Sequence, residues 1–233
     1  MNLFQRPLAL VLAVTACLTL LFGYKTQDAQ SLLASDDTVA VSEIQTGWLF
    51  DGAGEDDALI FYPGALVEPA AYAPLLREVA AKGVDCFLVN MPLDLAVLNP
   101  GKAKRVMQSG TYDRWFFAGH SLGGAMAAQF AAKHPETPAG LFLLGAYTAK
   151  DLTKAAFPVV CIYGSEDGVL NRKRLQKSFT LSPDTLEVVE LNGGNHAQFG
   201  VYGPQRGDGT ATISAADQRK QTVQVIVQTV FDQ

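Results

Sequence analysis

The sequence has few of the residues that disulfide frameworks and nucleic-acid surfaces require. Its 233 residues include three cysteines, at positions 17, 86 and 161. Cys86 and Cys161 fall within apolar, strand-like runs, where cysteine usually serves as a small hydrophobic side chain, so no disulfide framework is expected. The net charge is −5 and no dense cluster of Lys and Arg is present, which argues against a nucleic-acid partner.

The residue patterns of several other chemistries are missing as well. The sequence offers neither the paired carboxylates of a sugar hydrolase nor the phosphate-binding loop of a nucleotide enzyme, and we expect no metal and no cofactor. No internal repeat or low-complexity linker occurs. An apolar content of 48% and a length of 233 residues suit one folded domain with a substantial core. The densest basic run, Arg172 to Arg174, is interpreted as the solvated start of a helix.

One long apolar run lies near the N-terminus. Residues 8–24 are almost continuously apolar, follow Arg6 and precede Lys25. The run is at the short limit for a spanning helix and longer than a usual signal-peptide core, which favours an uncleaved anchor over a cleaved signal. A lipoprotein with its lipid on Cys17 is the third alternative. Each alternative predicts a catalytic body outside the cytoplasm. The chain thus divides into a membrane segment (1–25), a tether (26–37) and a globular domain (38–233).

Within the globular domain, strand-like and helix-like runs alternate. The pattern predicts an α/β fold with a mostly parallel sheet and helices on both faces. One or two antiparallel strands are expected between residues 36 and 51. The later strands are expected at 58–62, 84–90, 114–118, 141–144, 159–163 and 185–190, and the helices at 68–82, 100–108, 122–133, 170–178 and 214–231. Residues 145–156 are too few to form a large lid domain.

A serine stands where one of these strands gives way to a helix. Gly119, Ser121 and Gly123 have the Gly-x-Ser-x-Gly spacing, in which the glycines make room for a serine held in a strained turn. The spacing alone is weakly specific. Its position between an aromatic strand and an alanine-rich helix is typical of a nucleophile elbow, so Ser121 is the candidate nucleophile.

A serine hydroxyl needs a general base within hydrogen-bond reach and a third group that orients this base. The chain has three histidines. His120 lies inside the elbow, where its side chain is expected to point away from that of the serine, and His134 lies at an expected helix end. His196 follows the last predicted strand in a glycine-rich loop that can bring an imidazole over the strand ends. His196 is therefore the candidate base.

The candidate for the orienting acid is Asp167, which follows the strand ending at Tyr163. The resulting order of serine, aspartate and histidine along the chain is the one that accompanies a nucleophile elbow. Glu166 is the rival acid and Asp151 a more distant one. The Gly-x-x-Asp spacing favours Asp167, because it gives the loop enough reach to turn back over the sheet.

Two backbone N–H groups are expected to stabilise the negative charge that develops during acyl transfer. Leu122 supplies one, because it follows the nucleophile at the start of a helix. The other is expected from the loop after the strand 58–62. Since Pro63 has no N–H, Ala65 is the preferred donor and Leu66 the alternative.

Three segments together resemble a small, lidless bacterial branch of the α/β-hydrolase superfamily that carries an N-terminal membrane segment. They are residues 61–67, 119–124 and 193–200, and residues 202–214 are similar to the tail of the same branch. The resemblance covers roughly residue 48 to the C-terminus. It implies an α/β-hydrolase fold, the triad Ser121, Asp167 and His196, and an esterase-like activity. Pro63-Gly64 stands where many members of the superfamily have His-Gly.

The leading hypothesis is a membrane-tethered or exported serine hydrolase that cleaves an ester through an acyl-enzyme. Without a lid, small or accessible esters, or an acyl group reached at the membrane surface, are the expected substrates. The alternatives are an acyltransferase with the same triad and a catalytically silent binding protein on the same scaffold. Residues 198–212 are either part of the pocket rim or a plain surface loop, and Tyr147 either lines the acyl pocket or packs in the core. The oligomeric state is left open.

Overall fold

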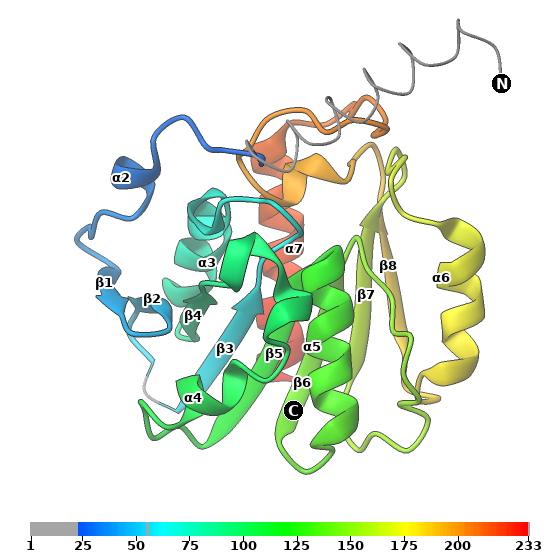
Figure 1. Cartoon of the computed structure of the whole chain (residues 1–233), viewed down its shortest axis with the longest axis horizontal. Coiled ribbons are helices and arrows are strands. Elements are labelled where there is room, and N and C mark those ends of the chain that lie inside the picture. The colour runs from blue at the N-terminus through cyan, green and yellow to red at the C-terminus, as the bar shows by residue number, and fades with distance from the viewer. Residues whose placement is uncertain (1–22, 55, 233) are drawn as a thin grey trace, which may run out of the picture.

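The computed structural model describes residues 23–54 and 56–232 (Figure 1). The expected membrane segment at 8–24 therefore lies almost wholly outside the described residues. Within the described part of the chain, no helix combines the length and the apolar character needed to cross a bilayer.

Eight strands form one sheet, in the order β1-β2-β4-β3-β5-β6-β7-β8. Strands β1 and β2 form an antiparallel hairpin, and β2 pairs antiparallel with β4, whereas all the other pairs are parallel. The strands are β1 (Ala40–Ile44), β2 (Gly47–Asp51), β3 (Asp57–Tyr62), β4 (Asp85–Val89), β5 (Arg114–His120), β6 (Pro138–Leu144), β7 (Val159–Gly164) and β8 (Glu187–Leu191). The mostly parallel sheet and the antiparallel strands that open it confirm the predicted fold class.

Helices cover both faces of this sheet (Figure 1). On one face lie α3 (Ala73–Ala80) and α7 (Ala215–Phe231), and on the other lie α4 (Ala103–Met107), α5 (Leu122–Lys133) and α6 (Arg172–Ser178). A short helix, α2 (Ala29–Leu32), precedes the sheet, and 3-10 turns occur at Pro69–Tyr72 (η1), Pro92–Asp94 (η2), Ala96–Leu98 (η3), Phe179–Leu181 (η4) and Ala197–Phe199 (η5). Among the described residues, the connection between β6 and β7 contains no helix, so no large lid domain is present there.

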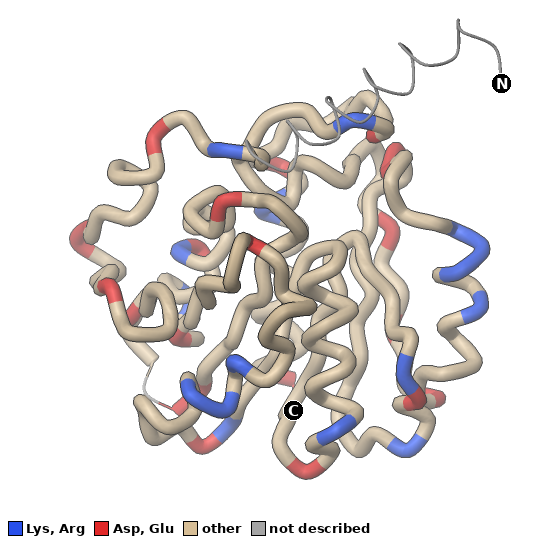
Figure 2. Tube along the Cα trace, viewed as in Figure 1, with Lys and Arg blue, Asp and Glu red and all other residues tan. Residues whose placement is uncertain are grey.

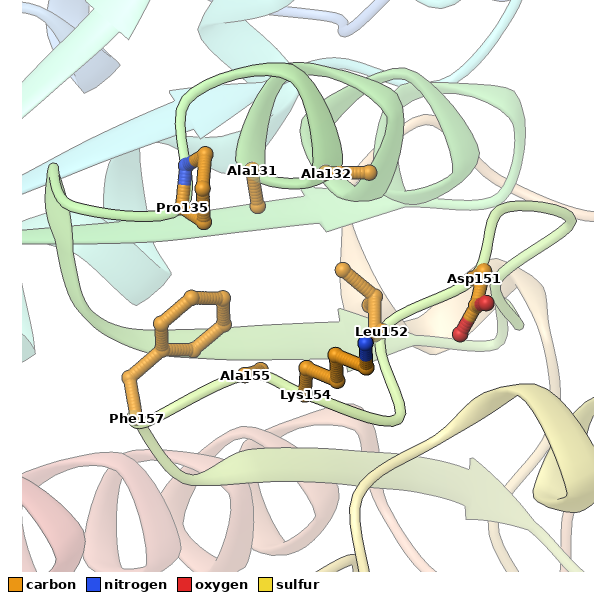
Figure 3. Close-up of a pocket in the computed structure, with 8 residues that line it drawn as sticks. All are labelled: Ala131, Ala132, Pro135, Asp151, Leu152, Lys154, Ala155 and Phe157. Carbon is orange, nitrogen blue, oxygen red and sulfur yellow. The ribbon is translucent and has the colours of Figure 1, made fainter.

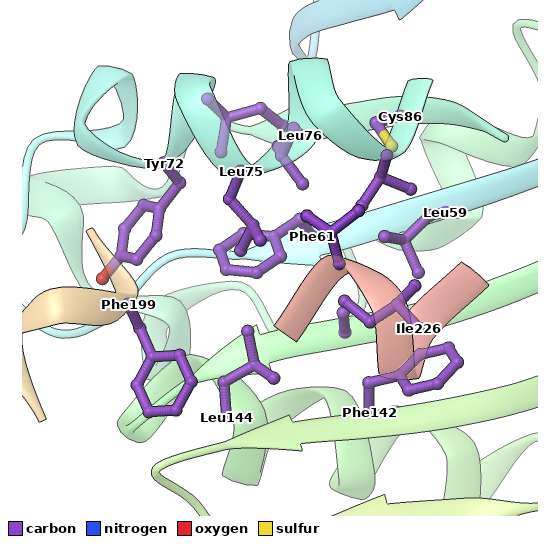
Figure 4. Close-up of a cluster of buried hydrophobic side chains, with 14 of the residues drawn as sticks. Leu59, Phe61, Tyr72, Leu75, Leu76, Cys86, Phe142, Leu144, Phe199 and Ile226 are labelled. Carbon is purple, nitrogen blue, oxygen red and sulfur yellow. The ribbon is translucent and has the colours of Figure 1, made fainter. Parts of the chain in front are cut away.

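The central strands are buried on both faces because helices cover both. In β3, every residue is buried, and the side chains alternate between two apolar clusters. Leu59 and Phe61 pack with α3 and α7, as Figure 4 shows, whereas Ile60 points to the α5 face. The continuous apolar runs in the sequence are thus the strands of a doubly covered parallel sheet.

The predicted helix at 68–82 is divided in the structure. Residues Pro69–Tyr72 form the 3-10 turn η1, and α3 begins only at Ala73. Pro74 explains the break, because proline has no N–H to donate and fits a helix only in its first turn. The other predicted helices and strands lie within a few residues of their expected bounds.

Candidate active site

Ser121 lies in a sharp turn between β5 and α5. Its backbone angles are φ 52° and ψ −122°, and a positive φ is uncommon and strained for a residue other than glycine. The flanking glycines permit the turn, because a Cβ at Gly123 would lie 2.2 Å from the carbonyl oxygen of Tyr62, and one at Gly119 would lie 2.5 Å from the backbone of Gly123. Helix α5 can therefore begin directly against the carboxyl end of β3.

Asp167 and His196 form a buried pair at the same edge of the sheet. The Nδ1 atom of His196 lies 2.8 Å from Oδ2 of Asp167, and both side chains are almost fully inaccessible to solvent. The other carboxylate oxygen, Oδ1, accepts the N–H groups of Val169 at 3.0 Å and Leu170 at 2.8 Å. These bonds hold the carboxylate in place, so Nδ1 of His196 carries the proton that it donates to Asp167. Nε2 is buried without a hydrogen-bond partner among the described residues, which leaves it free to accept a proton.

Ser121 and His196 line one pocket of about 370 Å³. Its walls come from the start of α5, the loop after β6, and the loop between β7 and α6. The lining residues are Ser121, Leu122, Ala125, Gly145, Ala146, Tyr147, Val169, Leu170, Asn171, Arg174 and His196. Tyr147, left open between two roles, lines this pocket. In an open parallel sheet, ligands bind beyond the carboxyl ends of the strands, where this pocket lies.

The rival candidate acids lie elsewhere. The side chain of Glu166 is exposed and accepts the hydroxyl of Ser165 at 3.0 Å. Asp151 is exposed and accepts the hydroxyl of Thr153 at 2.7 Å. It lines a different pocket, near the C-terminal end of α5, which contains none of the three candidate triad residues (Figure 3).

The loop after β3 presents backbone N–H groups beside the elbow. Gly64 donates its N–H to the hydroxyl of Tyr72 at 3.0 Å, and Leu66 donates its N–H to the carbonyl oxygen of Asp94 at 2.8 Å. The N–H group of Leu66, the alternative oxyanion donor, is thus already engaged in a hydrogen bond. In the described part of the chain, the N–H groups of Ala65 and Leu122 make no hydrogen bond. They are the two donors that remain available.

His120 supports this loop from within the protein. Its Nδ1 lies 2.8 Å from the hydroxyl of Tyr72, which also accepts the N–H of Gly64. The ring of His120 packs 4.4 Å from that of His196, centroid to centroid. Burial lowers the pKa of His120 well below its usual range, so His120 is neutral. His134 lies at the end of α5 with its ring 4.7 Å from that of Phe130 and is not part of the pocket.

Residues 198–212 contribute a side chain that supports the candidate site and that the sequence pattern did not predict. Rather than lining the pocket, this segment places Asp208 between the loops that carry the candidate acid and base. Its Oδ1 accepts N–H groups of Gly168 at 3.1 Å, His196 at 3.2 Å and Gly209 at 2.9 Å, and Oδ2 accepts that of Ala197 at 2.8 Å. The available sequence signal is the Gly-Asp-Gly at 207–209, which lies within the tail segment 202–214.

A second support for the base comes from α7. Gln218, which is fully buried, accepts the N–H of Asn195 at 2.9 Å and donates its amide to the carbonyl oxygen of Asn195 at 2.8 Å. The residue directly before His196 is thus held by the closing helix. Within the described residues, no cluster of His, Cys, Asp and Glu is arranged to hold a metal ion.

The sequence matches a family model described as "Alpha/beta hydrolase family" over residues 58–220. The chain belongs to this family. The match begins in β3 and ends in α7, so it contains the elbow, both loops of the Asp167–His196 pair and the loop after β3. No curated protein matches the sequence.

Solved structures of other α/β hydrolases share the fold of this chain at low sequence identity. A carboxylesterase from Bacillus subtilis superposes with a TM-score of 0.62 at 13% identity, covering 88% of this chain and 95% of the other. A dienelactone hydrolase from Anabaena variabilis gives 0.57 at 13% identity, with 83% and 95% covered. A carboxyl esterase from Tuber melanosporum gives 0.58 at 13% identity, with 88% and 89% covered. At identities this low, the superpositions show a common fold alone.

Proposed function

We propose that this α/β hydrolase is a serine esterase that cleaves its substrate through an acyl-enzyme, with Ser121 as nucleophile, His196 as general base and Asp167 as the orienting acid. The proposal rests on one observation above all. The strained Ser121 lines a single pocket with His196, whose ring is held by the buried Asp167. The esterases among the solved structures of the same fold are consistent with this reaction.

In the first half of the reaction, Oγ of Ser121 attacks the ester carbonyl carbon and its proton passes to Nε2 of His196. The imidazolium that forms is stabilised by the Asp167 carboxylate, which accepts the Nδ1 proton. The developing oxyanion accepts the N–H groups of Ala65 and Leu122. Removal of one such donor typically costs about 3 kcal/mol of transition-state stabilisation.

Collapse of this intermediate breaks the ester C–O bond, and the alcohol leaves with the proton from His196. In the second half, a water molecule gives its proton to Nε2 of His196 and attacks the acyl carbon. The acid product then leaves, and Ser121 regains its proton. In an acyltransferase, an alcohol or amine would replace this water.

The decisive experiment is labelling of the purified full-length protein with a fluorophosphonate probe. The parent should be labelled and Ser121→Ala should not. Ser42→Ala, which changes an exposed serine on β1, is the matched control and should be labelled like the parent. Equal labelling of the parent and Ser121→Ala, or no labelling of either, would refute the assignment of the nucleophile.

The N-terminal apolar run leads us to propose an anchored enzyme with its catalytic domain outside the cytoplasm. The described chain starts beside the loop after β3, since Tyr24 donates its N–H to Leu66 and accepts that of Glu68 at 2.9 Å. Nearby, η2 and η3 expose Leu93 by 79% and Leu98 by 53%. An anchor would therefore hold the pocket edge of the domain near the bilayer.

Membrane fractionation of the full-length protein tests this placement. An anchored enzyme stays with the membranes after an alkaline carbonate wash and is released by detergent. If mass spectrometry shows that the recovered protein lacks the apolar run, the run is a cleaved signal instead. Recovery of the intact chain in the soluble fraction would contradict the anchor.

A further inference from the structure

Helix α6 concentrates positive charge in a chain whose net charge is −5 (Figure 2). Its seven residues include four basic side chains and no acidic one: Arg172, Lys173, Arg174 and Lys177. The sequence pattern predicts that the start of this helix is solvated. In the structure, these side chains have different surroundings.

Arg172 has a structural role. Its guanidinium donates to the carbonyl oxygens of Gly164 at 2.8 Å and Ser165 at 3.0 Å, and it lies 4.3 Å from the centre of the Tyr163 ring. It also lies 3.4 Å from the Glu190 carboxylate. These contacts fix the start of α6 against the end of β7 and leave Arg172 unavailable to a ligand.

Arg174 lies at the candidate active site instead. It lines the same pocket as Ser121 and His196, and its guanidinium makes no hydrogen bond or ion pair within residues 23–54 and 56–232. An arginine presents five N–H donors in a rigid fork that matches a carboxylate or a phosphate. The unpaired guanidinium is thus open to an anion that enters this pocket.

A second pocket, of about 310 Å³, continues along α6. It shares Tyr147 and Arg174 with the first and adds Lys177, one turn further along the helix. Among the residues that the structure describes, no Asp or Glu side chain lines either pocket. A negatively charged group therefore finds two cations and no carboxylate on the path that leads from Ser121 along α6.

We infer that the ester cleaved at Ser121 carries an anionic group, a carboxylate or a phosphate, on the part that extends toward α6. Arg174 is its principal partner and Lys177 the second. The inference rests on the proposed function, because it concerns the substrate of Ser121. The anionic group itself takes no part in bond breaking.

Matched pairs of esters test the inference on the full-length protein. Mono-(p-nitrophenyl) glutarate and p-nitrophenyl pentanoate have acyl chains of equal length, of which only the first ends in a carboxylate. A second pair, 4-carboxyphenyl and phenyl butanoate, places the charge on the alcohol side. In one of the pairs, Arg174→Gln should lower the ratio of kcat/KM for the anionic ester to that for the neutral ester by roughly two- to fivefold, mainly through KM.

Lys173→Gln is the matched control, because it removes one charge from the same helix at a residue that lines neither pocket. It should leave the ratio unchanged. Added salt should reduce the preference of the parent for the anionic ester, since Arg174 is exposed and its charge is screened.

The possible failures can be told apart. If hydrolysis depends on Ser121 but Arg174→Gln changes the ratio in neither pair, this inference is wrong and the proposed function stands. The inference is also wrong, and the proposed function stands, if Lys173→Gln and Arg174→Gln lower the ratio equally. The positive electrostatic potential of the whole helix would then explain the preference. If no ester is hydrolysed in a Ser121-dependent manner, both fail.

Discussion

The substitution Asp208→Asn tests whether Asp208 positions the candidate triad without taking part in the chemistry. The carboxylate accepts four backbone N–H groups, which come from the acid loop at Gly168, the base loop at His196 and Ala197, and its own neighbour Gly209. It thereby ties together two loops that are far apart in the sequence. Asp208 does not line the pocket, so its replacement changes no contact with the substrate.

The magnitude follows from the four bonds. An asparagine has one acceptor oxygen, so the bond from Ala197 is lost, and the three others become bonds to a neutral group. A hydrogen bond to a charged group contributes about 1.5–3 kcal/mol and one between neutral groups about 1 kcal/mol. Because Asp208 is only half-buried, we expect a loss of about 2–4 kcal/mol in the free energy of unfolding. A looser His196 should lower kcat by roughly ten- to a hundredfold, with little change in KM.

The assay measures kcat per site, with competent sites counted by fluorophosphonate labelling, at a temperature well below the unfolding midpoint. Asp151→Asn is the control, because that loop carboxylate also bonds local N–H and O–H groups but lies in the pocket of Figure 3. It should leave kcat unchanged. An Asp208→Asn protein that is less stable but has the parent's kcat per labelled site would refute the positioning role.

Three further outcomes are expected. Asp167→Asn should lower kcat by about four orders of magnitude, whereas Glu166→Gln should not lower it. The reverse pattern in ester turnover would identify Glu166 as the acid. Tyr72→Phe should lower kcat more than Tyr62→Phe. Each substitution removes a buried hydroxyl that accepts one N–H group, but only the Tyr72 hydroxyl bonds the loop after β3. Equal losses of kcat would contradict this difference. The depressed pKa of His120 means that, below about pH 6.5, the unfolded chain binds a proton that the folded chain does not. Stability should therefore fall as the pH falls below this value, by up to about 1.4 kcal/mol per pH unit, and chemical denaturation across pH should show a weaker dependence in His120→Asn than in the parent. Identical slopes would contradict the neutral state of His120.

The sequence predicted what depends on local patterns. Apolar runs located the strands, and the alanine-rich run after Ser121 located α5 within its observed bounds, 122–133. The break at Pro74 was missed because the apolar periodicity continues across it. The Gly-x-x-Asp spacing and the glycine-rich loop before His196, together with the order along the chain, selected Asp167 and His196, whose side chains the fold brings to 2.8 Å from each other.

The positions of Asp208 and Arg174 in the candidate site could not be predicted from the sequence, because their surroundings depend on long-range contacts. Asp208 is separated from Gly168 by 40 residues, and nothing in the local pattern indicates that their loops meet. Lys173 and Arg174 are adjacent basic residues, and the sequence pattern does not distinguish their surroundings. Only the direction in which α6 leaves β7 decides that Arg174, and not Lys173, lines the pocket with Ser121. The choice between Ala65 and Leu66 likewise required the contact of Leu66 with Asp94.

Pro63-Gly64 stands where many superfamily members have His-Gly, but a histidine from another part of the chain lies beside this loop. The histidine nearest to this loop comes from the end of β5, and it reaches Gly64 through the hydroxyl of Tyr72. Because the ring of His120 also packs against that of His196, one neutral side chain contacts both the base and the support of the proposed oxyanion donors. A proton on His120 would place a charge in a contact that is closed to solvent, because the His120 side chain is fully buried. The burial that keeps His120 neutral is therefore part of what holds the loop after β3 in place.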